Sequence, residues 1–278
     1  MGGAPRVVAT DLDGTLLRTD GTVSDRTRSV LRRLDDAGVH VVFVTARPPR
    51  WLPALADVAG GHGTAVVLNG AAVYDFTTGT LGHVHAFERA AAAALVDDLR
   101  TAIPGLRFVL ERLDGPVYDP GFTSTHPVPD DARRVDVATT LTPPGPGGDP
   151  RDAGPGTRVG KILAQRPDLS HDDLYARVAG VVRDRVVLAY SGAHALAELS
   201  APGVTKAAGL ARWCAAHDVA PRDVWAFGDM PNDLPMLAWA GRGVAVASAH
   251  PDVLAAADAT TGTNDDDGVA TYLERLLA

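Results

Sequence analysis

Three short apolar runs, each followed at once by polar residues, constrain the fold of this chain most strongly. They are Val7–Ala9, Val39–Val44 and Ala65–Leu68, and His40 is the one polar residue within them. Runs this apolar predict strands buried on both faces, as in parallel sheets covered by helices. Helices are expected between them, over about 25–37 and 50–59. The alternation predicts a doubly wound α/β fold with a parallel, Rossmann-like sheet.

A change of rhythm after about residue 71 indicates an inserted domain. Hairpins, short extended pieces and isolated helices replace the alternation, which returns from Lys206 onwards. We therefore predict a core made of residues 1–82 and 193–278, and an inserted α+β domain over 83–192. Within the insertion, residues 142–157 contain five prolines and five glycines, which favours a flexible loop.

Two carboxylates follow the first strand. Asp11 and Asp13 are separated by one residue, so their side chains leave an extended backbone on the same side and can face one small volume. Gly14 allows a sharp turn and a close approach of the backbone to a ligand. The simpler alternative is a strand-to-loop turn with solvated aspartates, because such loops are rich in Asp and Gly.

Three further polar clusters occur where strands end or a helix begins. Thr45 follows the second strand, Lys206 opens a helix, and Asp229, Asn232 and Asp233 follow the apolar run 224–227. Taken singly, Thr45 fits a cap, Lys206 fits a solvated surface lysine, and the segment with Asp229 fits a turn. Together they fit the carboxyl edge of a parallel sheet, where ligands bind. Carboxylates suit Mg2+, whereas a hydroxyl, an ammonium and an amide suit a phosphoryl group.

With these motifs the chain resembles the haloacid dehalogenase-like superfamily of Mg2+-dependent phosphohydrolases. The insertion between the second motif and Lys206 makes it similar to the Cof-type sugar-phosphatase branch. Ala46 and Ala207 stand where this family often has glycine. The resemblance is carried by Asp11-Leu12-Asp13-Gly14-Thr15-Leu16, Val42-Phe43-Val44-Thr45-Ala46-Arg47, Asn69-Gly70-Ala71, Gly203-Val204-Thr205-Lys206, Gly228-Asp229-Met230-Pro231-Asn232-Asp233 and Asn264-Asp265-Asp266-Asp267-Gly268-Val269.

The resemblance implies a role for each carboxylate. Asp11 would be the nucleophile that forms an aspartyl-phosphate, and Asp13 the general acid and then the general base. Mg2+ would be held by the Asp11 side chain, the Asp13 carbonyl oxygen and Asp229, with Asp233 behind them.

The remaining motif residues would bind the substrate. The resemblance implies that Gly14, Thr45, Lys206 and Asn232 bind the phosphoryl group, and that the insertion is a cap domain. Candidates for binding the rest of the substrate are Arg47 and Asn69 in the core and Arg112, Asp114, His126 and Arg166 in the insertion. The alternative for each of the four insertion residues is that it lies on the solvated surface and binds no substrate. Residues 264–267 suggest a calcium loop, but the later glutamate of that motif is missing, so a turn that begins a helix is expected.

Composition excludes some classes of function. The formal net charge of -8 argues against a nucleic-acid surface, which needs a basic stripe. A single cysteine, Cys214, permits no internal disulfide and is expected to be a core residue. No apolar run approaches a membrane span and no signal peptide precedes the first strand, so we expect a cytoplasmic protein that is a monomer or a small homo-oligomer.

We therefore predict a Mg2+-dependent phosphohydrolase acting on a small phosphorylated metabolite, with sugar phosphates favoured. One alternative is a phosphotransferase or phosphomutase of sugar phosphates, which would pass the phosphoryl group to another sugar. Another is a phosphometabolite-binding protein with weak turnover. The Asp11 and Asp13 pair argues against the second alternative, because binding alone needs no second carboxylate there.

Overall fold

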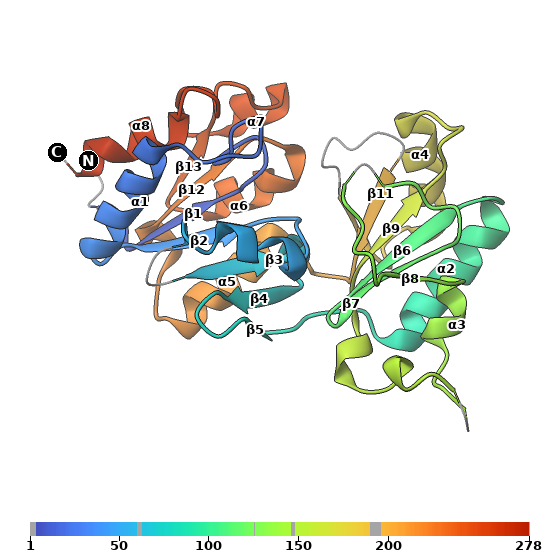
Figure 1. The fold of residues 1–278 in the computed structure, drawn as a ribbon. Coiled ribbons are helices and arrows are strands. Elements are labelled where there is room, and N and C mark those ends of the chain that lie inside the picture. The colour runs from blue at the N-terminus through green and yellow to red at the C-terminus, as the bar shows by residue number, and fades with distance from the viewer. Residues whose placement is uncertain (1–3, 60–62, 125, 146–147, 190–195, 278) are drawn as a thin grey trace. The chain divides into compact units, whose positions relative to one another are not determined.

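The structure is a computed structural model that describes residues 4–59, 63–124, 126–145, 148–189 and 196–277. The chain divides into two compact units (Figure 1). Met1–Val84 and Thr205–Ala278 form what we call the core unit, and His85–Val204 form the inserted unit. The sequence predicts limits of the insertion at about 83 and 192. Residue 192 lies outside the described residues, and the strand that follows it belongs to the inserted unit because it pairs with that unit's sheet.

The core unit is built on one eight-stranded sheet in the order β14-β13-β12-β1-β2-β3-β4-β5. Strands β14 to β3 of this order run parallel, whereas β4 and β5 form an antiparallel hairpin at one edge. Strand β1 lies between β12 and β2 and is fully buried. The strands are β1 (Val7–Thr10), β2 (His40–Val44), β3 (Thr64–Val67), β4 (Ala72–Asp75), β5 (Thr80–Gly82), β12 (Val224–Gly228), β13 (Arg242–Ala245) and β14 (Ala259–Thr260).

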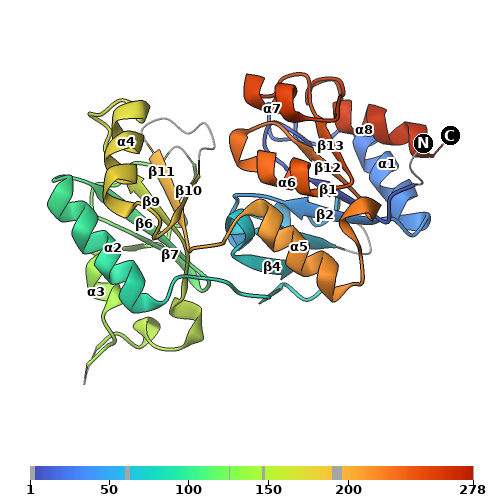
Figure 2. The ribbon, with the colours of Figure 1, turned by 180° about the vertical axis from the view of Figure 1, so that it is seen from behind.

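Helices cover both faces of this sheet, which confirms the predicted doubly wound α/β fold. Helices α1 and α8 pack together on one face, and α5 and α6 pack together on the other (Figures 1 and 2). Ser24 caps α1 by accepting a hydrogen bond from the Thr27 amide, and the helix buries Val30, Leu31 and Leu34. The helices are α1 (Asp25–Asp36), α5 (Lys206–Ala216), α6 (Leu234–Trp239), α7 (Pro251–Ala256) and α8 (Gly268–Leu273).

The inserted unit is a second sheet with helices on one face, in agreement with the expected α+β insertion (Figure 2). Its strand order is β10-β11-β9-β6-β7-β8, and every pair except β7–β8 is antiparallel. Helices α2 and α4 pack together and against this sheet. The elements are α2 (Arg89–Ala102), β6 (Arg107–Arg112), β7 (Gly115–Tyr118), β8 (Arg133–Arg134), α3 (Val137–Leu141), β9 (Val159–Gln165), α4 (His171–Val182), β10 (Val187–Ala189) and β11 (Leu196–Ser200).

The prediction of a helix over 50–59 is wrong. Two single 3-10 turns, Pro49–Trp51 and Pro53–Leu55, take its place. The ring of Pro53 removes a backbone donor, so a continuous α-helix cannot form there. None of the helices formed by the described residues is long and apolar enough to span a bilayer.

Part of the Pro/Gly-rich stretch 142–157 is tied to the inserted sheet. Pro150–Asp152 forms a 3-10 turn, and Asp152 is buried. Its carboxylate accepts hydrogen bonds from Arg112 Nη1 at 2.7 Å and Arg133 Nη1 at 2.6 Å. Arg112 also pairs with Asp114 at 2.6 Å, so its guanidinium is bound within the protein. Residues 146 and 147 of this stretch lie outside the described part of the chain.

One buried carboxylate holds three elements of the inserted unit together. Asp119 is 2% exposed and accepts hydrogen bonds from the Phe108 amide in β6, at 2.9 Å, and the Val137 amide in α3, at 3.0 Å. Both of its oxygens also accept from Arg100 Nη2 of α2, at 2.8 and 2.9 Å.

We expect Asp119→Ala to lower the free energy of unfolding by about 2–4 kcal/mol, because it leaves two buried amides without their acceptor and removes one of the two carboxylates that Arg100 binds. Chemical denaturation measures this change. The matched control is Asp98→Ala, which removes the exposed partner of Arg185 and should change stability by less than about 0.5 kcal/mol. Equal effects of the two substitutions would contradict this account.

Candidate active site

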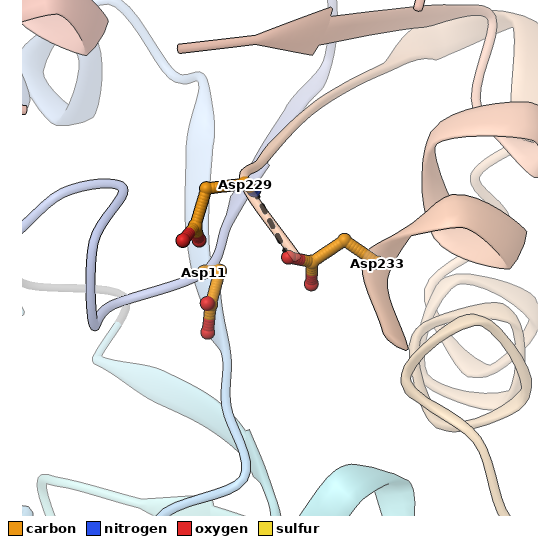
Figure 3. A group of neighbouring side chains, drawn as sticks. All are labelled: Asp11, Asp229 and Asp233. Carbon is orange, nitrogen blue, oxygen red and sulfur yellow. Dashed lines mark hydrogen bonds between the residues drawn. The ribbon is translucent and has the colours of Figure 1, made fainter. Parts of the chain in front are cut away.

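Three carboxylates meet at the carboxyl edge of the core sheet. Asp11 follows β1 and Asp229 follows β12, and these strands are neighbours, so the two side chains emerge side by side (Figure 3). Asp233 comes from the turn Pro231–Asp233 that precedes α6. One carboxylate oxygen of each residue lies within 4.8 Å of the others. The sequence prediction that Asp11, Asp229 and Asp233 gather in one place agrees with this geometry.

Lys206 provides a positive charge inside this group. The residue is 2% exposed, and its Nζ lies 2.9 Å from Asp11 Oδ1 and 2.6 Å from Asp233 Oδ1. It stands at the first position of α5, where Thr205 caps the helix by accepting a hydrogen bond from the Ala208 amide. Since one ammonium faces three carboxylates, the ionised group carries a formal charge of -2.

Asp233 uses both of its oxygens to hold its neighbours. It is fully buried, and Oδ2 accepts hydrogen bonds from the amides of Asp229 at 3.1 Å and Met230 at 3.0 Å, while Oδ1 binds Lys206. Figure 3 shows the bond to the Asp229 amide. This carboxylate therefore orients the backbone that presents Asp229.

Sequence reasoning missed the role of Thr15. Its Oγ1 donates a hydrogen bond of 2.6 Å to Asp229 Oδ1. Gly14 is the reason that this loop comes so close. Its φ is +78°, and a Cβ there would lie 2.4 Å from Asp229 Oδ2. The sequence signal for this contact is Gly14 in the run Asp11–Thr15, because a glycine allows the backbone to approach a neighbouring group closely.

Burial sets the charge states of this group. Desolvation raises the pKa of Asp11 well above its usual value, Lys206 opposes this shift, and the nearby Asp233 and Asp229 charges add to it. Desolvation also raises the pKa of Asp229, to about 6. For Lys206 desolvation lowers the pKa, but the Asp11 and Asp233 carboxylates outweigh it and the net shift is upward.

These residues fit a divalent metal ion. Three buried carboxylates with a net negative charge supply the hard oxygen ligands that such an ion prefers, and a cation among them would offset the desolvation and the repulsion that raise the pKa values of Asp11 and Asp229. Asp11, Asp229 and Asp233 are therefore the residues that would hold it.

Asp13 has a different environment from Asp11. Its side chain is 60% exposed and is bound in a two-pronged pair by Arg47, with Nε at 2.8 Å from Oδ2 and Nη2 at 2.5 Å from Oδ1. Arg47 is predicted from the sequence to bind substrate, and in the structure its guanidinium binds the second carboxylate of the motif. The two aspartates are thus divided, with Asp11 beside Lys206 and Asp13 beside Arg47.

Thr45, Asn69 and Asn232 complete the predicted set. Thr45 is fully buried at the end of β2, and its Oγ1 accepts a hydrogen bond from the Arg47 amide at 3.1 Å. Asn69 has a left-handed backbone with φ of +57°, and its Oδ1 accepts from Asn232 Nδ2 at 3.4 Å. Among the described residues, nothing bonds the buried Asn232 Oδ1. An amide with unused hydrogen-bonding capacity beside the carboxylates suits a polar ligand.

The acidic run 264–267 is structural. Asp265 accepts a hydrogen bond from the Thr19 amide at 2.8 Å, and Asp267 pairs with Arg18 at 2.9 Å. Asn264 Nδ2 donates to the Leu17 carbonyl oxygen at 3.0 Å. These side chains fasten the segment after β1 to the turn that begins α8, in agreement with the expected role.

Comparison with known proteins identifies the family. Residues 8–273 match the family model described as haloacid dehalogenase-like hydrolase. The chain therefore belongs to this family, and the predicted enzyme class, a phosphatase of the superfamily, is confirmed.

Two curated relatives match almost the whole chain. The 5-amino-6-(5-phospho-D-ribitylamino)uracil phosphatase YitU of Bacillus subtilis is 29% identical, over 99% of this chain and 98% of its own. The pyridoxal phosphate phosphatase YbhA of Escherichia coli is also 29% identical, over 96% and 97%.

Solved structures show the same fold. A haloacid dehalogenase-like hydrolase from Bacteroides thetaiotaomicron matches with a TM-score of 0.75 and 25% identity, over 97% of this chain and 98% of its own. Another from B. subtilis matches with a TM-score of 0.75 and 24% identity, over 98% and 99%.

The charge of the site makes a prediction for metal binding. We expect Mg2+ at a hundredfold excess over its Kd to raise the melting temperature by about 5–10 °C at pH 7.5. Because the folded-state pKa of Asp229 is raised to about 6, the folded metal-free protein binds that proton more tightly than the unfolded chain. The proton therefore stabilises the metal-free protein as the pH falls through 6, and it competes with the metal. The Mg2+-induced rise in melting temperature should therefore be smaller at pH 5.5 than at pH 7.5.

Differential scanning fluorimetry with and without Mg2+ measures these shifts. Asp229→Asn should abolish most of the Mg2+-induced rise. The control Asp131→Asn removes an exposed carboxylate of the inserted unit and should keep the rise. A rise that is the same in wild type and Asp229→Asn would show that the metal binds elsewhere.

Proposed function

We propose that this protein is a Mg2+-dependent phosphatase of a small phosphorylated metabolite that works through a phosphorylated aspartate. The observation that carries the proposal is the buried Lys206 between Asp11 and Asp233, with Asp229 beside them at the carboxyl edge of the sheet. An anionic cluster of this kind with one fixed cation is suited to a phosphoryl group that arrives together with a metal ion.

Asp11 is the nucleophile in this scheme. Its carboxylate oxygen attacks phosphorus, a bond from that oxygen to phosphorus forms, and the ester bond to the leaving-group oxygen breaks. Lys206 holds Asp11 Oδ1 at 2.9 Å and so limits the orientations of the carboxylate. Bound Mg2+ would neutralise charge on the phosphoryl oxygens and keep Asp11 ionised.

Asp13 carries the protons. In the first step it protonates the leaving alkoxide, and in the second it removes a proton from the water that attacks the aspartyl-phosphate. Its side chain is 60% exposed, so it can reach both the leaving group and water, in contrast to the buried Asp11. Thr45, Lys206, Asn232 and the backbone at Gly14 then bind the phosphoryl oxygens.

Two observations support the proposed substrate class. The curated relatives act on different phosphorylated metabolites, as their names state, so they support the class of small phosphate esters. The core residues above contact the phosphoryl group only, so discrimination has to come from other parts of the chain. We assign that task to the inserted unit as a cap and favour sugar phosphates, following the resemblance to the Cof-type branch.

The first prediction concerns the nucleophile. Asp11→Asn should abolish turnover of p-nitrophenyl phosphate and of any natural substrate, because an amide cannot form the phosphorylated intermediate. The melting temperature of the metal-free variant should hold or rise, since burial already disfavours the Asp11 charge. Steady-state assays with Mg2+ test this. Measurable turnover by a purified, folded variant would rule out Asp11 as nucleophile.

Arg47 provides a second prediction. Arg47→Ala should lower kcat for an alkyl phosphate about tenfold or more, because Asp13 is then no longer held in place to protonate a poor leaving group. It should lower kcat for p-nitrophenyl phosphate much less, because nitrophenolate leaves without a proton. If both substrates show a raised KM and an unchanged kcat, Arg47 binds substrate, as the sequence analysis expected, and does not position Asp13.

A further inference from the structure

A strained turn follows strand β3 and emerges at the same edge of the core sheet as Thr45, because β2 and β3 are neighbouring parallel strands. Its residues Leu68, Asn69 and Gly70 all have positive φ, of +53°, +57° and +104°. Glycine adopts such angles freely and asparagine tolerates them, whereas for leucine they are rare and cost energy. Strain of this kind is kept where the surrounding structure enforces it, and it clusters at functional sites. We call Leu68–Gly70 the β3 turn.

The β3 turn is bonded to the backbone that follows β2. The Asn69 amide donates a hydrogen bond of 3.1 Å to the Thr45 carbonyl oxygen. The Leu68 amide donates a bond of 3.1 Å to the Arg47 carbonyl oxygen. Thr45 is one of the residues that bind the phosphoryl group in the proposed function. The two bonds fix the backbone on either side of Ala46, so they also fix the position from which the Thr45 side chain extends.

The other side of the β3 turn packs against the start of α5 at very short range. A Cβ at Gly70 would lie 2.1 Å from the Thr205 carbonyl oxygen, and a Cβ at Gly209 would lie 2.7 Å from the Gly70 Cα. Both glycines are therefore needed for the two backbones to come this close. Since Lys206 is the first residue of α5, this contact sets the position from which its side chain reaches the carboxylates.

Two side-chain contacts add to these links. Arg212 of α5 donates a hydrogen bond from Nη2 to the Gly70 carbonyl oxygen at 2.7 Å, which ties the turn to that helix. Asn69 Oδ1 accepts a hydrogen bond from Asn232 Nδ2 at 3.4 Å. The β3 turn thus contacts the end of β2, the start of α5 and the turn before α6, all within the core unit.

We propose that the β3 turn positions Thr45, Lys206 and Asn232 around the phosphoryl group, an inference that rests on the proposed phosphatase function. In this role Asn69 is a positioning residue, in contrast to the substrate-binding role predicted for it from the sequence. The three phosphate-binding residues come from separate segments, and a misplacement of about 1 Å in such a group can lower a rate by about a hundredfold. One rigid turn in contact with all three segments limits that misplacement.

Two substitutions of Asn69 separate the shape of the turn from the side chain. Asn69→Gly removes the amide but keeps a left-handed backbone, whereas Asn69→Ala removes the amide and disfavours this backbone. Asn69→Ala should lower kcat/KM about tenfold or more, and Asn69→Gly about threefold or less. The loss should also appear with p-nitrophenyl phosphate, whose leaving group needs no proton, because the turn acts on the residues that bind the phosphoryl group.

Asp218 provides the matched control. It lies in the core unit just after the far end of α5, is exposed, and has φ of +52°. Asp218→Ala imposes the same backbone strain away from the active site. It should lower the melting temperature by about 2–6 °C, as Asn69→Ala should, and leave kcat/KM unchanged within about twofold. A merely structural role of Asn69 would likewise change the melting temperature and not kcat/KM.

Arg212→Met tests the same link without backbone strain. It removes the donor to the Gly70 carbonyl oxygen and keeps an unbranched apolar stem. It should lower kcat/KM about threefold to fivefold, as expected for one lost hydrogen bond. This variant decides the inference if Asn69→Ala does not purify as a folded protein.

The experiment uses the full-length protein with Mg2+, butyl phosphate and p-nitrophenyl phosphate. A larger loss in Asn69→Ala than in Asn69→Gly, with kcat/KM kept in Asp218→Ala, supports the inference. Equal losses in the two Asn69 variants would assign the effect to the side chain, and an unchanged kcat/KM in Asn69→Ala would leave the turn no part in catalysis. Either result overturns the inference and leaves the phosphatase function intact. A wild type that hydrolyses neither ester overturns both.

Discussion

The pairing of one buried ammonium with two buried carboxylates is the interaction on which the active site depends. Lys206 is almost inaccessible to water and lies within 3 Å of both Asp11 and Asp233. A charge buried in this way persists only if it is paired, so Lys206 requires a carboxylate partner. Because they come from the end of β1, the start of α5 and the turn before α6, this pairing fixes three distant segments at one point.

The fold makes this arrangement possible through its strand order. Strands β12, β1 and β2 are adjacent and parallel, so the residues that follow them emerge at the same edge of the sheet. Desolvation on burial raises the pKa values of Asp11 and Asp229, and repulsion from the neighbouring carboxylates adds to the rise. The same repulsion prepares the site for a divalent cation. The fold thus holds an excess of negative charge that a bound divalent cation would offset.

Much of the core fold and the position of the site could be predicted from the sequence, because the apolar runs before Asp11, Thr45 and Asp229 specify strands and a shared sheet edge. The contacts between side chains could not be predicted from the sequence. Periodicity does not show that Thr15 bonds Asp229, or that Arg47 turns to Asp13, since both depend on rotamers and on the path of a loop. In the inserted unit no motif marked Asp119, because its contacts with β6, α2 and α3 are visible only once these elements are in place.

The central claim is that Asp11 carries the phosphoryl group during turnover. The direct measurement is to quench the enzyme in acid while it hydrolyses p-nitrophenyl phosphate with Mg2+, reduce the sample with borohydride, and map it by mass spectrometry. An aspartyl-phosphate is an acyl phosphate, so the account predicts that Asp11 is converted to homoserine while Asp13 remains aspartate. Reduction at Asp13 instead, or phosphate on another side chain with Asp11 unmodified, would contradict it.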